Sequence, residues 1–159
     1  MRNAFKMGGA FLALLGMTGQ VMAADACARR DDRMAMRAAA LQQELMVAAL
    51  TCHAVPRYNE FVLSYQKQLR SSDNALKKYF VRTSGSQAAY HAFKTRLANQ
   101  DSIRSIHDGN YCAEAATVFD AAHATKSLSA LVMHTPVMMD ADYTSCGDGG
   151  SDTMSASRE

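Results

Sequence analysis

Apolar residues recur at spacings of three and four along most of the chain, which is the period of an α-helix with one buried face. The first such segment runs from about residue 31 to residue 52, and its stripe consists of Met34, Ala38, Leu41, Leu45, Ala48 and Cys52. Asp31 and Asp32 stand at its start, where carboxylates can cap free backbone amides and favour the helix dipole. The pattern predicts a helix over residues 31–52.

Two further segments follow, and each ends at a residue that commonly stops a helix. The second covers about residues 56–83, begins at Pro56, which suits a first helical turn, and stops at Gly85. Its stripe is Tyr58, Phe61, Val62, Tyr65, Leu69, Leu76, Tyr79 and Phe80. Ser86 offers a cap for the third segment, whose stripe is Tyr90, Phe93, Leu97, Ile103 and Ile106. Polar runs at residues 71–74 and 99–102 predict a kink or a break in the second and third helices.

The fourth segment runs from Tyr111, after the turn signal Asp108-Gly109-Asn110, to about Met133, and Pro136 ends it. Short connections between long helices make neighbours antiparallel. We therefore expect an all-α fold, an up-down-up-down four-helix bundle. Its core should contain Leu41, Leu45, Phe61, Tyr65, Phe80, Phe93, Leu97, Phe119 and Leu131.

The N-terminal residues have the features of a cleavable export signal. Arg2 and Lys6 precede an uncharged apolar run, and Val21-Met22-Ala23 has the small residues that signal peptidases require. We expect residues 1–23 to be removed by a cut before Ala24, residues 24–146 to form the helical bundle domain, and residues 147–159 to be a disordered tail rich in Gly, Ser and Asp. The mature protein would then be soluble and periplasmic or secreted, without a membrane span.

Export brings the four cysteines into an oxidising compartment, where disulfides form. In an up-down-up-down bundle, Cys52 ends the first helix at the pole where Cys112 begins the fourth, while Cys27 and Cys146 lie at the opposite pole. A disulfide tolerates only about 4.4–6.8 Å between Cα atoms. We therefore expect the pairs Cys52–Cys112 and Cys27–Cys146. The second pair has an alternative, in which Cys146, placed in a flexible segment, stays free or pairs with another molecule.

Net charge bears on possible partners. The chain has 17 basic and 15 acidic residues, and loss of Arg2 and Lys6 with the signal makes the mature protein neutral. A general nucleic-acid binder needs a basic surface, so we expect no nucleic-acid partner. A partner could instead be another exported protein or a component of the cell envelope.

No motif for catalysis or for a cofactor is present. The chain lacks Cys-x-x-Cys, His-Glu-x-x-His, Gly-x-Ser-x-Gly and a phosphate-binding loop. We therefore expect no cofactor and no enzymatic activity, although an enzyme whose site assembles only in three dimensions stays open as an alternative. A pocket containing Arg104, His107 and a carboxylate would favour that alternative.

A second alternative is periplasmic copper handling. Thioether and imidazole groups suit Cu(I), and one short segment contains several of them, at Met133, His134, Met138 and Met139. The other interpretation, which we favour, is that these methionines fill irregular space in the core.

A basic ridge at the start of the first helix is a candidate anion-binding surface, and it consists of Arg29, Arg30, Arg33 and Arg37. Cations there oppose the helix dipole, which could indicate an anionic partner. The simpler alternative is that the ridge pairs with Asp31, Asp32 or the acidic tail.

Two stretches carry a resemblance. Residues 41–52 with Tyr58-Asn59-Glu60-Phe61, and Tyr111-Cys112-Ala113 before a helix that contains Phe119, resemble small exported bacterial proteins of uncharacterised function. The resemblance covers about residues 27–123 and implies no activity, cofactor or catalytic residue. The sequence as a whole predicts an exported helical protein with a binding or structural accessory role.

Overall fold

The structure is a computed structural model, and it describes residues 27–137, 139 and 143–146. Five helices form this part of the chain: α1 (Arg30–Thr51), α2 (Val55–Ser84), α3 (Gln87–His107), α4 (Tyr111–Ala124) and α5 (Leu128–His134). The described residues contain no strand, only an isolated bridge between Ala28 and Ser145. The all-helical prediction is confirmed. The expected signal at residues 1–23 and the expected tail at residues 147–159 lie outside the described residues.

The helices begin and end largely where the sequence predicts. The Asp32 carboxylate accepts the backbone N–H of Arg29 (2.9 Å) at the start of α1, and Pro56 lies in the first turn of α2. Gly85, with φ of 70°, ends α2 in the left-handed conformation that glycine adopts without strain. Ser86 then accepts the N–H of Ala88 (3.0 Å) and caps α3.

The two polar runs expected to interrupt helices do not interrupt them. Residues 71–74 continue α2 because Asp73 has partners there: it binds Lys77 one turn later (2.8 Å) and accepts a hydrogen bond from Tyr90 of α3 (2.5 Å). Residues 99–102 continue α3, where the Ser102 hydroxyl donates to the Ala98 carbonyl within the helix (2.7 Å). Polar side chains that find partners of this kind no longer compete with the helix backbone.

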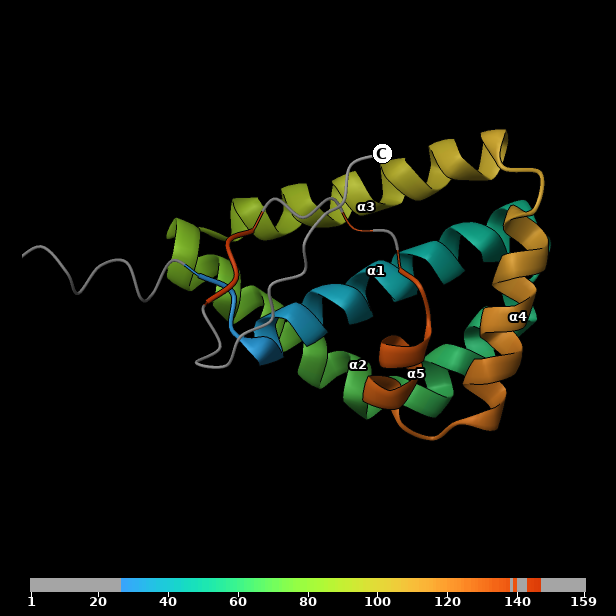
Figure 1. The fold of residues 1–159 in the computed structure, drawn as a ribbon, viewed down its shortest axis with the longest axis horizontal. Helices are drawn as coiled ribbons and strands as arrows, with labels where there is room; N and C mark the ends of the chain where they lie inside the picture. Colours follow the sequence, from blue (N-terminus) through green and yellow to red (C-terminus); the bar gives the residue numbers. More distant parts are fainter. Residues whose placement is uncertain (1–26, 138, 140–142, 147–159) are drawn as a thin grey trace, which may run out of the picture.

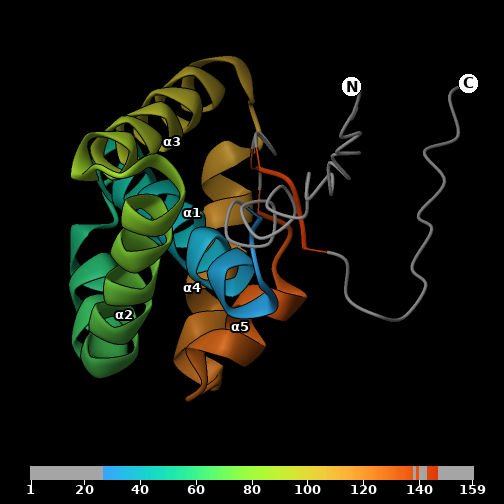
Figure 2. The ribbon, with the colours of Figure 1, turned by 90° about the vertical axis from the view of Figure 1, so that its left-hand side faces the viewer.

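The fourth predicted helix is divided into two. Residues 125–127 separate α4 from α5, and Ser127 caps α5 by accepting the N–H of Ala130 (3.3 Å). α4 also runs at a steep angle to α3 rather than alongside it (Figures 1 and 2). The four-helix bundle with up-down-up-down order is therefore not confirmed.

Helix α1 lies at the centre and packs against all four other helices (Figure 1). Its buried face is rich in alanine, and small side chains let neighbouring helices approach closely. Two clusters of buried side chains form the core. The first joins α1 to α2, α4 and α5, around residues such as Leu41, Leu45, Phe61, Tyr65, Tyr111 and Phe119. The second joins α1 to α2 and α3, around residues such as Met36, Leu76, Tyr79, Phe93 and Leu97.

The predicted core residues are buried, with Phe80 only partly so. The predicted stripe of α3 is wrong in its second half, because Ile103 and Ile106 are 61% and 78% exposed. The inward-facing positions there are instead Asp101, which is buried, and Arg104, which contacts α1 and α4. The buried face of α3 thus changes from apolar to charged after Leu97.

Both cysteine pairs lie at disulfide distance, in the pairing that the sequence predicts. The Cα atoms of Cys52 and Cys112 are 5.6 Å apart, and those of Cys27 and Cys146 are 4.8 Å apart. Beside the second pair, the backbone N–H of Ala28 donates to the carbonyl of Thr144 (2.8 Å). The backbone N–H of Cys146 donates to the carbonyl of Ala28 (3.0 Å). The segment before α1 is thereby joined to the segment around residue 145.

Within the described part of the chain, none of the helices combines the length and the apolar character that crossing a membrane would require.

Candidate functional site

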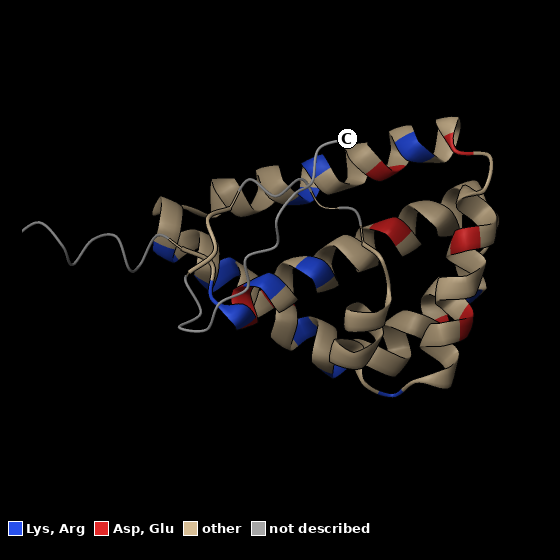
Figure 3. Ribbon diagram, viewed as in Figure 1, with Lys and Arg blue, Asp and Glu red and all other residues tan. Residues whose placement is uncertain are grey.

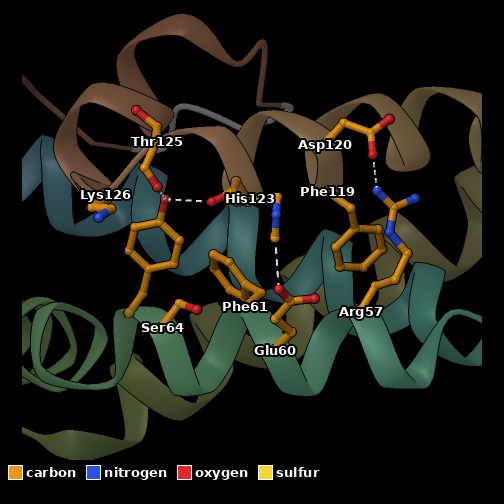
Figure 4. A pocket seen from close by; sticks show the side chains of 11 residues that line it. Arg57, Glu60, Phe61, Ser64, Phe119, Asp120, His123, Thr125 and Lys126 are labelled. Atoms are coloured by element: carbon orange, nitrogen blue, oxygen red, sulfur yellow. Dashed lines mark hydrogen bonds and ion pairs between the residues drawn. The ribbon is translucent and has the colours of Figure 1, made fainter.

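A row of side chains along α2 faces α4 and the turn after it. The row recurs at helical spacing and contains Arg57, Glu60, Phe61, Ser64, Tyr65 and Gln68. The opposite wall comes from α4 and from residues 125–126, which the same row holds in place (Figure 4). Between the two walls lies a groove, which we call the α2–α4 groove.

An ion pair and a hydrogen bond between a histidine and a carboxylate cross the α2–α4 groove. The Arg57 guanidinium binds the Asp120 carboxylate, donates to the Ala116 carbonyl (3.2 Å) and lies over the Phe119 ring at 5.1 Å. One turn further along α2, Glu60 Oε1 lies 2.8 Å from Nδ1 of His123 (Figure 4). Because all four of these side chains are more than a third exposed, each contact contributes little to stability and chiefly orients the side chains.

Buried hydrogen bonds hold the far end of the groove. The Tyr65 hydroxyl donates to the carbonyls of Ala122 (2.9 Å) and Thr125 (2.5 Å), acceptors at the end of α4 that have no partner within the helix. Burial raises the pKa of Tyr65, so its hydroxyl stays protonated and remains a donor. Gln68 fixes the next residues, because its amide donates to Lys126 O (3.1 Å) and accepts from Leu128 N (2.7 Å).

The groove has a volume of about 760 Å³, and three buried aromatic residues form its floor: Phe61, Tyr65 and Phe119. This volume lies within the range of about 300–1,000 Å³ that is usual for small-molecule sites. Ser64 and Lys126 also line it, and within the described part of the chain neither side chain has a hydrogen bond or an ion pair. The groove therefore presents a hydroxyl and an ammonium group that the fold itself does not use.

Ser64, His123 and Glu60 line the same groove, which raises the possibility of hydrolytic chemistry. A carboxylate bound to Nδ1 of a histidine is the arrangement found in serine hydrolases. Catalysis also requires that the histidine reach the nucleophile, and no hydrogen bond joins Ser64 to His123. We therefore assign no catalytic role to these three residues.

Two arginines of the basic ridge are anchored to backbone carbonyls. Arg37 donates to Val132 O (3.0 Å) and Thr135 O (3.3 Å), and Arg33 donates to Ala28 O (3.3 Å). Asp32, one of the expected partners of the ridge, binds Arg82 of α2 (2.6 Å) and accepts the backbone N–H of Arg29 (2.9 Å). Anion binding at the ridge stays a prediction.

The copper candidates are placed as follows. Met133 and His134 are exposed on α5, Met139 packs partly buried against the second cluster, and Met138 lies outside the described residues. Over the described ranges, no group of three or more His, Cys, Asp or Glu side chains could hold a metal ion. Copper binding by these residues stays a prediction.

Sequence reasoning did not single out the residues that line the groove. The row of α2 side chains at helical spacing is a signal that could have indicated them, but their partners on α4 are about 60 residues away. From the sequence, a pocket with Arg104, His107 and a carboxylate is the feature that would favour an enzyme. Part of that set is present, because Arg104 lines a second groove with Glu44 and Glu114.

No protein-family model matches this chain, and no curated protein or solved structure shows a significant match to it.

Proposed function

We propose that this chain is an exported binding protein whose α2–α4 groove holds a small ligand with an acidic group and an apolar body. The observation that carries this proposal is that Lys126 and Ser64 line a groove of about 760 Å³ without a partner among the described residues. Other polar lining residues already have partners: Arg57 binds Asp120, and Glu60 contacts Nδ1 of His123. The Lys126 ammonium is thus left to attract an anion.

The apolar part of the ligand would lie against the aromatic floor. Aromatic side chains with a few placed polar groups are the usual lining of a small-molecule site, in which the apolar surface gives affinity and the polar groups give orientation. Here Ser64 and Lys126 stand on opposite walls, one on α2 and one after α4 (Figure 4). A ligand that contacts both would join the walls.

Export is part of the proposal. The basic start, the apolar run and Val21-Met22-Ala23 support a signal that is cut before Ala24, and two cysteine pairs at disulfide distance fit an oxidising compartment. We infer a bacterial protein of the periplasm or the surrounding medium that acts without enzymatic activity. N-terminal sequencing of the exported protein should begin at Ala24, within a residue or two. A start at a lipid-modified Cys27 would contradict this processing.

Two small probes of the same shape test the binding proposal. Benzoate and benzamide differ in charge but hardly in size, and each can be titrated into the intact, oxidised protein while backbone amide NMR signals are followed. We expect benzoate to shift signals of residues 57–65 and 119–126, and benzamide to shift them less. Equal effects of the two probes, or shifts elsewhere only, would contradict an anion-selective groove.

Matched variants test whether the Lys126 ammonium supplies the charge that binds benzoate. Lys126→Ala should weaken benzoate binding by about tenfold, because a hydrogen bond to a charged group contributes about 1.5 kcal/mol or more. Lys78→Ala removes an exposed lysine of α2 that does not line the groove, so it should leave binding unchanged. Mass spectrometry of what leaves the denatured native protein would then identify the natural ligand.

A further inference from the structure

The interface between α1, the second half of α3 and the start of α4 is charged rather than apolar. Arg104 of α3 binds Glu44 of α1 (2.9 Å) and Glu114 of α4, and it contacts Asp108 one turn later in its own helix (3.5 Å). Its guanidinium also lies 5.2 Å from the centre of the Tyr111 ring. Figure 3 shows the acidic positions of the three helices gathered here. One arginine therefore serves three carboxylates.

A fourth carboxyl group is buried in the same interface. Asp101 precedes Arg104 by three residues on α3 and is only 4% exposed, while Glu44 opposite is 3% exposed. The carboxyl group of Asp101 has no hydrogen bond within the described part of the chain. The charged and titratable groups that act on it come from three helices: Glu44 from α1, Arg104 from α3 and Tyr111 from α4. Asp108 and Glu114 compete with it for Arg104.

A buried carboxyl beside another carboxylate favours its neutral form. Burial first, and then the charge of Glu44, raise the pKa of Asp101 to about 7, against a smaller opposing effect of Arg104. Burial also raises the pKa of Glu44, but Glu44 has the direct bond to Arg104. Asp101 is therefore the member of the pair that takes the proton.

We propose that Asp101 and Glu44 form a proton-operated latch that holds the second half of α3 against α1 and α4. With Asp101 neutral, Glu44 is the buried carboxylate whose charge Arg104 balances, and the interface is closed. Loss of the proton places a second buried negative charge against Glu44, and the last turns of α3 loosen. The latch is independent of the α2–α4 groove, since none of its residues lines that groove.

The direction in which pH changes the stability of the closed interface follows from the two states of Asp101. In the unfolded or opened chain its pKa is near 3.8, and in the closed interface it is about 7. The closed form thus holds the proton more tightly, so its extra stability is fully present below about pH 4 and is lost as the pH rises through 7. Mild acid closes the latch, and neutral to alkaline pH opens it.

Opening would alter a second groove. Glu44, Arg104 and Glu114 line it together with Arg37, Pro136 and Val137, and its volume is about 630 Å³. Since α3 supplies one of its walls through Arg104, the shape of this groove depends on the state of the latch.

Amide hydrogen exchange of the intact, oxidised protein tests the latch. After correction for the intrinsic exchange rate, protection of residues 101–107 should fall by about thirtyfold between pH of about 5.5 and about 8, while protection of α2 stays nearly constant. Unchanged protection in α3 would overturn the proposal. An equal fall in all helices would also overturn it, because it would mean global destabilisation rather than local opening.

Two variants test whether the Asp101 carboxyl causes this pH dependence. Asp101→Asn should remove the pH dependence in residues 101–107, and Asp31→Asn, at an exposed position outside the cluster, should retain it. Persistence of the effect in Asp101→Asn would assign it to another group. Should that variant fail to fold, the carboxyl carbon of Asp101 can be titrated by NMR in the unaltered protein. A midpoint near pH 7 would support the latch, and one below about pH 5 would overturn it.

Discussion

Oδ2 of Asp32 lies 2.6 Å from Nη2 of Arg82, so the first turn of α1 is joined to the end of α2. The same carboxylate oxygen accepts the backbone N–H of Arg29 (2.9 Å). Arg82 in turn lies over the Tyr79 ring at 5.5 Å and is about three-quarters buried. One carboxylate therefore serves as a helix cap and as an ion-pair partner 50 residues away.

Replacing Asp32 should destabilise the protein more than replacing its neighbour. Asp32→Ala leaves the largely buried Arg82 without this partner and removes the cap, so the free energy of unfolding should fall by about 2–4 kcal/mol. Asp31→Ala, at an exposed position in the same turn, should cost less than about 1 kcal/mol. Urea unfolding of the two variants measures the difference, and equal losses would mean that the Arg82 contact contributes nothing.

The core can be probed on α3 and α4. Phe93→Ala and Phe119→Ala should each lower the free energy of unfolding by about 3–5 kcal/mol, because both rings are buried in the two clusters. Ile106→Ala, at a 78% exposed position, should change it by less than about 0.5 kcal/mol. A large loss of unfolding free energy in Ile106→Ala would mean that Ile106 is buried, as the apolar stripe predicted for α3 requires.

The pair Cys52–Cys112 closes a loop across 60 positions of the chain. Removing both sulfurs with Cys52→Ala and Cys112→Ala should lower the free energy of unfolding by about 2–4 kcal/mol. Peptide mapping without reduction should recover Cys52 linked to Cys112 and Cys27 linked to Cys146. Cys52 linked to Cys27 would be incompatible with the structure, because the length of α1 separates these two residues.

Asp73 gives a pH dependence of the opposite sign to that of Asp101. Burial alone would raise its pKa, but the hydrogen bonds from Lys77 and Tyr90 together with the charges of Lys77 and Lys94 outweigh burial, and the pKa is lowered from 3.8. The stabilisation by Asp73 is therefore present above about pH 4 and is lost as the pH falls through its lowered pKa. Asp73→Asn should cost about 1 kcal/mol at neutral pH and progressively less as the pH falls below about 4, as urea unfolding over a series of pH values would show. A constant difference would exclude the carboxylate as the cause.

Local signals in the sequence sufficed for the ends of α1, α2 and α3, for much of the core and for the cysteine pairs, but they did not reveal the break between α4 and α5. Pro56 and Gly85 act within one turn of the helix they limit, so no knowledge of the fold is needed to interpret them. The cysteine pairing needed only that each end of α1 lie beside its partner cysteine, with Cys112 near the end of α1 and Cys146 near its start, and this holds although the up-down-up-down order is not confirmed.

The second half of α3 and the α2–α4 groove required three-dimensional information. Asp101 and Arg104 belong to charged residue types, so an apolar pattern assigns them to the solvent. Yet Glu44 and Glu114 from other helices pair with Arg104, and burial raises the pKa of Asp101 and favours its neutral form. Arg57 and Asp120 likewise look like ordinary surface residues until α4 turns toward α2. Spacing along one helix cannot reveal a partner that another helix supplies.

The two cysteine pairs are nested, since residues 52 and 112 both lie between residues 27 and 146. With both bonds formed, tension applied between Cys27 and Cys146 would pass through a sulfur–sulfur bond and leave the helices between them unloaded. A protease cut in the exposed turn at Gly109 would give two pieces that remain covalently joined. The protein would then survive stretching and nicking as one covalent unit, and would come apart after such damage only under reducing conditions.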